Sequence, residues 1–198
     1  MLRTQIEPSL SNLDNLNLIY PWIPNSQSIR PSSQNIERKK HLAQLIDLEW
    51  KSYKDYIFHI VFGERYYVDG EESGYTKFVN PKYFKYNREW AFQPSMFPYD
   101  VKCDETNHWI LWNSTKDFNY DYDIDIINKV IENHLSYHTI LGDPFQFVWY
   151  KNPKPTIPEF YHVQVFWTSG INETNSHKFE YKPNLINIPV VKQILDSK

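Results

Sequence analysis

Three short segments rich in aromatic residues constrain the fold of this chain more than any other feature. They are His108–Asn113, Phe145–Tyr150 and Tyr161–Trp167, and turn-forming residues bound each of them. Short runs of β-branched and aromatic residues between turns are typical of β-strands. Apolar residues occupy both alternating faces of each run, which predicts strands that are buried on two sides. The few polar residues inside them therefore need hydrogen-bond partners or a function.

A helix with one apolar face is predicted between the first two strands. Its apolar stripe consists of Ile124, Ile127, Val130, Ile131 and Leu135. The acidic segment 117–123 precedes this stripe and suits a helix N-terminus, where carboxylates accept hydrogen bonds from free N–H groups. A strand, a helix and a strand in this order predict a βαβ unit with a right-handed parallel crossover. The proline-rich connection 152–158 is too short for a helix and predicts that the third strand returns antiparallel.

The sequence therefore predicts a single α+β domain, with a mixed β-sheet that contains the βαβ unit and with helices packed on it. Residues 1–35, rich in Asn, Ser and Pro, are predicted to be an N-terminal arm that docks through a short apolar stretch. Residues 36–198 are predicted to form the globular domain.

The first part of this domain contains the strongest helix candidate, residues 36–62. Ser33 or Asn35 can cap its start, and Gly63 stands where a glycine ends many helices. The following segment has no clear period, and its acidic part, residues 69–74, predicts a turn in a mobile loop.

Composition limits the location and the partners of the protein. Of the 198 residues, 41% are hydrophobic and 23% charged, which is typical of a globular protein. The single cysteine, Cys103, excludes an internal disulfide and fits a reducing compartment. No apolar stretch reaches the roughly 18 residues of a membrane span, and the N-terminus lacks the apolar core of a signal peptide. The net charge of −3 gives no reason to bind nucleic acid or an anionic membrane. We expect a soluble, cytoplasmic protein that is also compatible with the nucleus.

Two patterns that resemble metal sites are better explained without a metal. The acidic residues within 117–123 alternate like calcium ligands, but Tyr122 and Asn128 stand where such a loop needs glycine and glutamate. His134 and His138 share a helix face, which suits a metal, yet the helix C-terminus favours histidine on its own. No phosphate-binding loop, zinc-binding cysteine pattern or serine-hydrolase motif occurs. The sequence predicts no cofactor and no required metal.

The polar residues inside the strands form the strongest candidate site. His162 alternates with Gln164 on one face of its strand, and Gln146 and His108 can join that face. Four such groups together would line a pocket with hydrogen-bond donors and a titratable base. A buried histidine with satisfied hydrogen bonds in an aromatic core explains the same pattern. The sequence leaves both interpretations open.

Five segments form a characteristic order along the chain. They are Trp50–Ile57, Phe97–Asp100, His108–Trp112, Val148–Pro153 and Ile157–Val163. In this order they resemble the N-acetylglucosamine-induced protein family of fungi, whose shared domain has no assigned activity. The resemblance covers roughly residues 45–167 and implies a soluble intracellular protein linked to the response to amino sugars. The family carries His-x-His near its last strand; His162 matches the second histidine, whereas Phe160 occupies the first position, so a reaction that needs both is not implied.

Three functional hypotheses remain. The first is a small-ligand-binding domain with an aromatic groove for a sugar or a nucleotide. Its candidate ligand-binding residues are Gln146, Asn152, Gln164, Trp112 and Trp149. The second is a small hydrolase or transferase, with His162 as general acid or base and with His108 and Lys151 stabilising developing negative charge. The third is a structural or protein-interaction module that docks a partner through the arm around Leu10–Trp22. The sequence does not indicate the oligomeric state.

Overall fold

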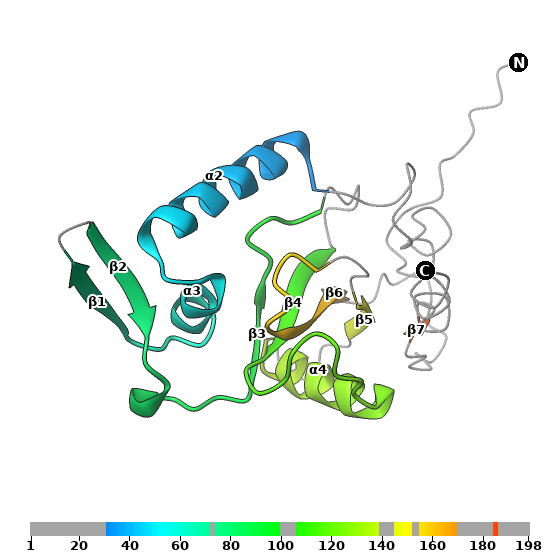
Figure 1. The fold of residues 1–198 in the computed structure, drawn as a ribbon. Coiled ribbons are helices and arrows are strands. Elements are labelled where there is room, and N and C mark those ends of the chain that lie inside the picture. The colour runs from blue at the N-terminus through cyan, green and yellow to red at the C-terminus, as the bar shows by residue number, and fades with distance from the viewer. Residues whose placement is uncertain are drawn as a thin grey trace, which may run out of the picture.

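The protein is described by a computed structural model, which covers residues 31–71, 74–99, 106–138, 145–151, 155–169 and 184–185 (Figure 1). Most of the predicted arm, Cys103 and Asn152 lie outside the described residues, as do the side chains of Gln146 and His138. The described chain has an α+β fold, as predicted, with a main sheet and a separate two-stranded hairpin.

The main sheet contains all three strands predicted from the aromatic segments. Its strands are β3 (Trp90–Pro94), β4 (Asn107–Asn113), β5 (Phe145–Tyr150), β6 (Tyr161–Ser169) and β7 (Asn184–Leu185). They lie in the order β3-β4-β6-β5-β7. The predicted antiparallel return is confirmed, because β6 pairs antiparallel with β5. All neighbours are antiparallel except β5 and β7, whose short pairing is parallel.

The predicted βαβ unit is not confirmed. Strands β4 and β5 are not neighbours, because β6 lies between them and pairs antiparallel with both. The two strands therefore run in the same direction without sharing hydrogen bonds. Strand order depends on contacts between distant segments, which the local sequence pattern does not specify.

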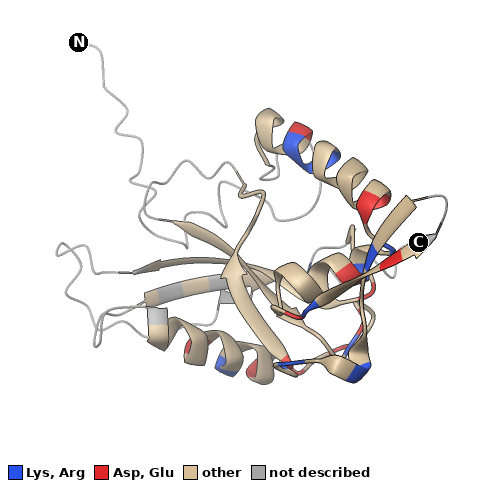
Figure 2. Cartoon of the chain, turned by 90° about the vertical axis from the view of Figure 1, so that its left-hand side faces the viewer, with Lys and Arg blue, Asp and Glu red and all other residues tan. Residues whose placement is uncertain are grey.

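Helix α4 (Ile124–His138) covers one face of the sheet, as its apolar stripe predicts (Figures 1 and 2). Ile127, Ile131 and Leu135 are fully buried against sheet residues, while Ile124 and Val130 pack at the margin of this core. The expected capping of this helix is seen for Asp123, whose Oδ1 accepts a hydrogen bond from the N–H of Asp125. Asp117 Oδ1 instead accepts a hydrogen bond from the N–H of Asn119, in the turn before the helix. These bonds give Asp117 and Asp123 a structural role in the backbone turns.

Two helices, not one, occupy the segment predicted as a continuous helix. They are α2 (Ser33–Glu49), capped by Ser32, and α3 (Tyr53–Ile60), capped by Ser52. Trp50 is extended between them and pairs with Lys77 of the hairpin. Ser52 accepts a hydrogen bond from the N–H of Asp55, which starts a new helix. Gly63 has a φ of +74°, in the left-handed region that ends helices.

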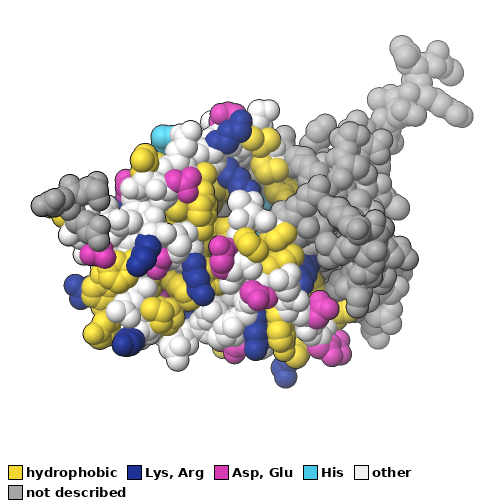
Figure 3. All heavy atoms as spheres, in the orientation of Figure 1, with side chains coloured by type: hydrophobic (Ala, Val, Ile, Leu, Met, Phe, Trp, Pro, Cys, Tyr) yellow, Lys and Arg dark blue, Asp and Glu magenta, His cyan; other side chains and the backbone are white. Residues whose placement is uncertain are grey.

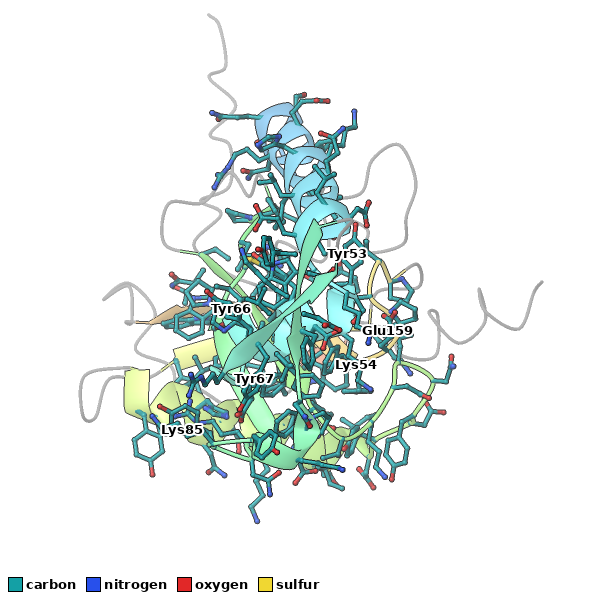
Figure 4. The ribbon with its side chains drawn as sticks, turned by 60° about the vertical axis from the view of Figure 1, so that its left-hand side comes forward. Tyr53, Lys54, Tyr66, Tyr67, Lys85 and Glu159 are labelled. Atoms are coloured by element: carbon teal, nitrogen blue, oxygen red, sulfur yellow. The ribbon has the colours of Figure 1, made fainter. Side chains whose placement is uncertain are left out.

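The segment predicted as an acidic loop contains a β-hairpin. Its strands are β1 (Tyr66–Glu71) and β2 (Gly74–Val79), so Asp69 and Glu71 lie near the end of β1. The N–H of Val79 donates to Asp55 Oδ1 at 2.8 Å, which ties the hairpin to α3. Figure 4 shows the hairpin crossing beside α3, with Tyr66 and Tyr67 on β1. A short 3-10 helix, η1 (Pro81–Tyr83), follows.

A second core lies on the sheet face opposite α4. Ile57 and Phe58 of α3 pack with Phe62, Trp112 and Phe160. The sheet is therefore covered on both faces, as its doubly apolar strands predict. Lys, Arg, Asp and Glu appear on the helices and the hairpin, while the described strands of the main sheet have none (Figure 2).

Glu64 is a buried carboxylate that holds the loop after η1 onto the end of α3. It is 1% exposed. Its two oxygens accept backbone hydrogen bonds from Lys85 at 2.6 Å, Tyr86 at 3.1 Å and Asn87 at 3.3 Å. Asn87 has a positive φ of 44°, an uncommon conformation that these bonds help to hold.

We expect Glu64→Gln to lower the free energy of unfolding by about 1–3 kcal/mol, because the new amide group would face a backbone N–H donor. Urea denaturation measures the change. The control is Glu37→Gln, since Glu37 forms an exposed ion pair with Lys40 and should change stability by less than about 0.5 kcal/mol. Equal losses in both variants would refute the structural role of Glu64.

We expect Ile131→Ala to lower the free energy of unfolding by about 2–5 kcal/mol, because it leaves a cavity between α4 and the sheet. Ile126 lies on the same helix and is 48% exposed, so Ile126→Ala is the matched control. It should cost less than about 1 kcal/mol. If the two variants unfold at the same urea concentration, α4 does not pack as described.

Candidate ligand-binding site

A cavity of about 520 Å³ lies between α2 and the sheet face opposite α4. Its floor consists of four side chains from two neighbouring strands: Ile110 and Trp112 of β4, and His162 and Gln164 of β6. The strand register explains why these four side chains lie together, because Trp112 pairs with His162 and Ile110 with Gln164. The volume is within the range of small-molecule sites.

Helices α2 and α3 supply the walls of the cavity that face this floor. The apolar stripe of α2 contributes Ile36, Leu42, Ala43 and Ile46, and α3 contributes Tyr53, Tyr56 and Ile57. Tyr53 lies where α3 begins, close to the end of α2 (Figure 4), and its hydroxyl approaches the carbonyl of Ala43 at 3.5 Å. The segments 95–97 and 156–157 and the side chains of Pro31 and Tyr99 complete the lining.

His162 is buried in the floor, with one ring nitrogen bonded to the backbone. Its Nδ1–H donates to the carbonyl of Phe160 at 3.0 Å, and its ring lies 4.7 Å from the ring of Trp112. Burial lowers the pKa of His162 to about 4, and the positive charges of Lys39 and Lys151 act in the same direction. The ring is therefore neutral near pH 7, with Nε2 as a hydrogen-bond acceptor. Among the described residues, Nε2 has no hydrogen-bond partner.

His108 uses both of its ring nitrogens for hydrogen bonds. The backbone N–H of Tyr99 donates to Nδ1 at 3.0 Å, so Nε2 carries the proton and donates to Gln164 Oε1 at 2.6 Å. The ring stacks on Phe166, with 4.4 Å between centroids. Burial lowers the pKa of His108 to about 4 against the opposing effect of the bond to Gln164. His108 is therefore neutral, and its Nε2–H group fixes the position of the Gln164 amide oxygen.

The remaining predicted site residues lie apart from this floor. The Nζ of Lys151 donates to the carbonyl of Tyr120 at 3.1 Å and lies over the ring of Phe118, and burial lowers its pKa. Trp149 lies on the α4 face, where its indole N–H donates to Asn128 Oδ1 at 2.8 Å. Gln146 pairs with Thr168 in the strand register; its side chain and all of Asn152 lie outside the described residues.

The structure thus brings three of the predicted residues together in one cavity, namely Trp112, His162 and Gln164, with His108 in direct contact. It does not bring Lys151 or Trp149 to the cavity lining. The assignment of these residues to catalysis or binding stays a prediction.

Lys39 is a cavity residue that the sequence reasoning missed. Its Nζ donates to Thr156 Oγ1 at 2.8 Å, and burial lowers its pKa. A signal for it exists in the sequence, because Lys39 stands on the apolar stripe of α2, three positions after Ile36 and before Leu42. A lysine on an apolar helix face indicates that its ammonium group lies at a cavity or against a partner.

His134, considered above as a possible metal ligand, packs its ring against that of Phe92, with 5.7 Å between the ring centroids. This contact does not test the prediction that the protein needs no metal. Within the described ranges, no group of three histidine, cysteine or acidic residues could hold a metal ion.

No described helix is long and apolar enough to cross a membrane. On the face drawn in Figure 3, basic and acidic side chains are intermixed rather than gathered by sign.

Comparisons with protein-family models, with curated proteins and with solved structures give no match. The resemblance to the N-acetylglucosamine-induced protein family therefore stays a prediction from the sequence.

The two buried histidines predict how stability depends on pH. Their folded-state pKa of about 4 lies below the ordinary value of 6.5, so the unfolded state binds more protons between these values. The free energy of unfolding should therefore fall as the pH drops from about 6.5 towards 4, by up to about 1.4 kcal/mol per pH unit for each histidine. Urea denaturation from pH 4.5 to 7.5 measures this slope.

His162→Gln should make this slope shallower, because one buried group no longer titrates. The control is His41→Gln, since His41 is exposed on α2. It keeps both buried histidines in place, so the part of the slope that they contribute should remain. Parallel curves for the native chain and both variants would show that His162 is not buried in a neutral form.

Proposed function

We propose that this chain is an intracellular small-ligand-binding domain that takes a sugar or a nucleotide-type ring in the cavity between α2 and the sheet. The observation that supports this most is the floor of the cavity, where His162 and Gln164 stand among aromatic and aliphatic side chains. Small-molecule sites commonly combine a mostly apolar surface with a few polar groups that orient the ligand.

The charges around the cavity are consistent with a ligand that carries phosphate. Lys39 and Lys40 of α2 both line it. Lys40 is paired with Glu37 at 2.7 Å, whereas Lys39 is bonded only to the hydroxyl of Thr156 among the described residues. A lysine that faces a neutral hydroxyl keeps its positive charge available for an anion. Sugar phosphates and nucleotides would place a ring on the floor and an anionic group near α2.

Binding is better supported than the hydrolase or transferase hypothesis. A general base works best when its pKa is close to the operating pH, and the pKa of His162 is lowered to about 4. Lys151 is held by Tyr120 and the neighbouring aromatic rings, and His108 has no free ring nitrogen. A neutral imidazole with one free nitrogen suits ligand recognition by hydrogen bonding. The hypothesis of a protein-interaction module rests on the arm, which lies outside the described residues.

A thermal-shift screen over amino sugars, sugar phosphates, nucleosides and nucleotides tests the proposal. A ligand present at 100 times its dissociation constant stabilises the native state by about 2.7 kcal/mol. For a chain of this size, that corresponds to a rise of roughly 5–10 °C in melting temperature.

Ala43→Phe should abolish the shift, because Ala43 lines the cavity and a phenyl ring there would occupy it. Leu48→Phe is the matched control on the same helix, since Leu48 is 76% exposed. It should leave the shift intact. The absence of any shift across all four compound classes, or an equal shift in Ala43→Phe, would count against a ligand site here.

A further inference from the structure

We infer that the cavity floor recognises the edge of a planar ring in which an N–H group stands next to a carbonyl, as in a lactam, a cyclic imide or a nucleobase of that type. This inference rests on the proposed function and narrows it, because it favours a planar heterocycle over a sugar. Two chains of hydrogen bonds on the sheet carry it.

The first chain determines how the amide of Gln164 is oriented. The backbone N–H of Tyr99 occupies Nδ1 of His108, which places the proton of that ring on Nε2. Nε2–H then donates to the amide oxygen of Gln164. A flipped amide would place its NH₂ group against an N–H donor, which is unfavourable. The amide oxygen of Gln164 therefore bonds to His108. Gln164 lines the cavity, and its NH₂ group is the donor that remains for a ligand.

The second chain determines the tautomer of His162. The carbonyl of Phe160 can only accept, so Nδ1 carries the proton and Nε2 presents its lone pair. His162 lines the same cavity, two residues before Gln164 on the same face of β6. Adjacent side chains thus present one acceptor and one donor in a defined order.

This pair discriminates among ligand edges. A lactam edge satisfies both side chains, because its N–H donates to His162 and its carbonyl accepts from Gln164. A carboxylate would place a second lone pair against His162 Nε2, and an ammonium would face the donor of Gln164 and the charge of Lys39. Ile110 of the floor and Ile46 of α2 cannot bond a hydroxyl, so a sugar ring lying against them would leave its hydroxyls on those sides unpaired. Each unpaired buried hydroxyl would cost affinity.

Quinolin-2(1H)-one and coumarin form a matched pair of probes. They have the same bicyclic shape and carbonyl, but coumarin has a ring oxygen in place of the lactam N–H. Titration calorimetry on the full chain compares their dissociation constants. We expect the lactam to bind at least about 10-fold more tightly, because a site built to accept an N–H rejects the isostere that lacks it.

Two variants assign this preference to the floor. His162→Phe removes the acceptor, so the preference for quinolin-2(1H)-one over coumarin should disappear. Gln164→Glu keeps an oxygen for His108 but replaces the donor, so the affinity for quinolin-2(1H)-one should fall at least about 10-fold. Circular dichroism melting checks that each variant is folded. If one variant does not fold, the other still tests the inference.

The outcomes separate this inference from the proposed function. Equal binding of both probes that is lost in Ala43→Phe would overturn the inference and leave the cavity as a ligand site. Binding of sugars or sugar phosphates, with neither probe bound, would do the same. A preference for the lactam that survives in both His162→Phe and Gln164→Glu would also overturn it. If neither probe binds and the compound screen gives no shift, both proposals fail.

Discussion

The two-sided burial of the β4–β6 strand pair is the constraint on which the rest of the structure depends. Neither strand carries a charged side chain, and both alternate apolar groups onto each face. Leaving either face in water would expose a large continuous apolar area. Helix α4 removes one face from water, whereas α3, Val79 at the end of the hairpin and Phe160 cover much of the other. The layered arrangement in Figures 1 and 2 follows from this requirement.

The same burial determines the chemistry of the site. Desolvation makes His108 and His162 neutral, so each ring has one donor nitrogen and one acceptor nitrogen. Three of these four nitrogens bond to the backbone or to Gln164. The fourth, Nε2 of His162, belongs to a residue that lines the cavity beside α2. The cavity is thus the place where the buried polar network of the sheet remains open to a ligand.

Much of the fold could be predicted from periodicity. The three aromatic segments are strands, and the stripe from Ile124 to Leu135 is the buried face of α4. The N-terminal half was predicted less well, because its apolar residues fit one long helix. The capping side chain of Ser52 and the extended Trp50 divide that helix. Trp50 pairs with the distant Lys77, a contact that the local sequence pattern does not specify. The hairpin was missed for a related reason, since acidic and glycine residues around its turn are also typical of loops.

The candidate site shows the same division. The amino-acid pattern alone predicts that His162 and Gln164 share a face of a strand, because side chains alternate along any β-strand. It also predicts that these polar groups are surrounded by apolar ones. Three features of the site arise from long-range packing: β4 lies beside β6, His108 bonds Gln164, and α2 encloses a cavity above them. Strand order and helix placement result from the summed packing of segments far apart in sequence, which no local pattern contains.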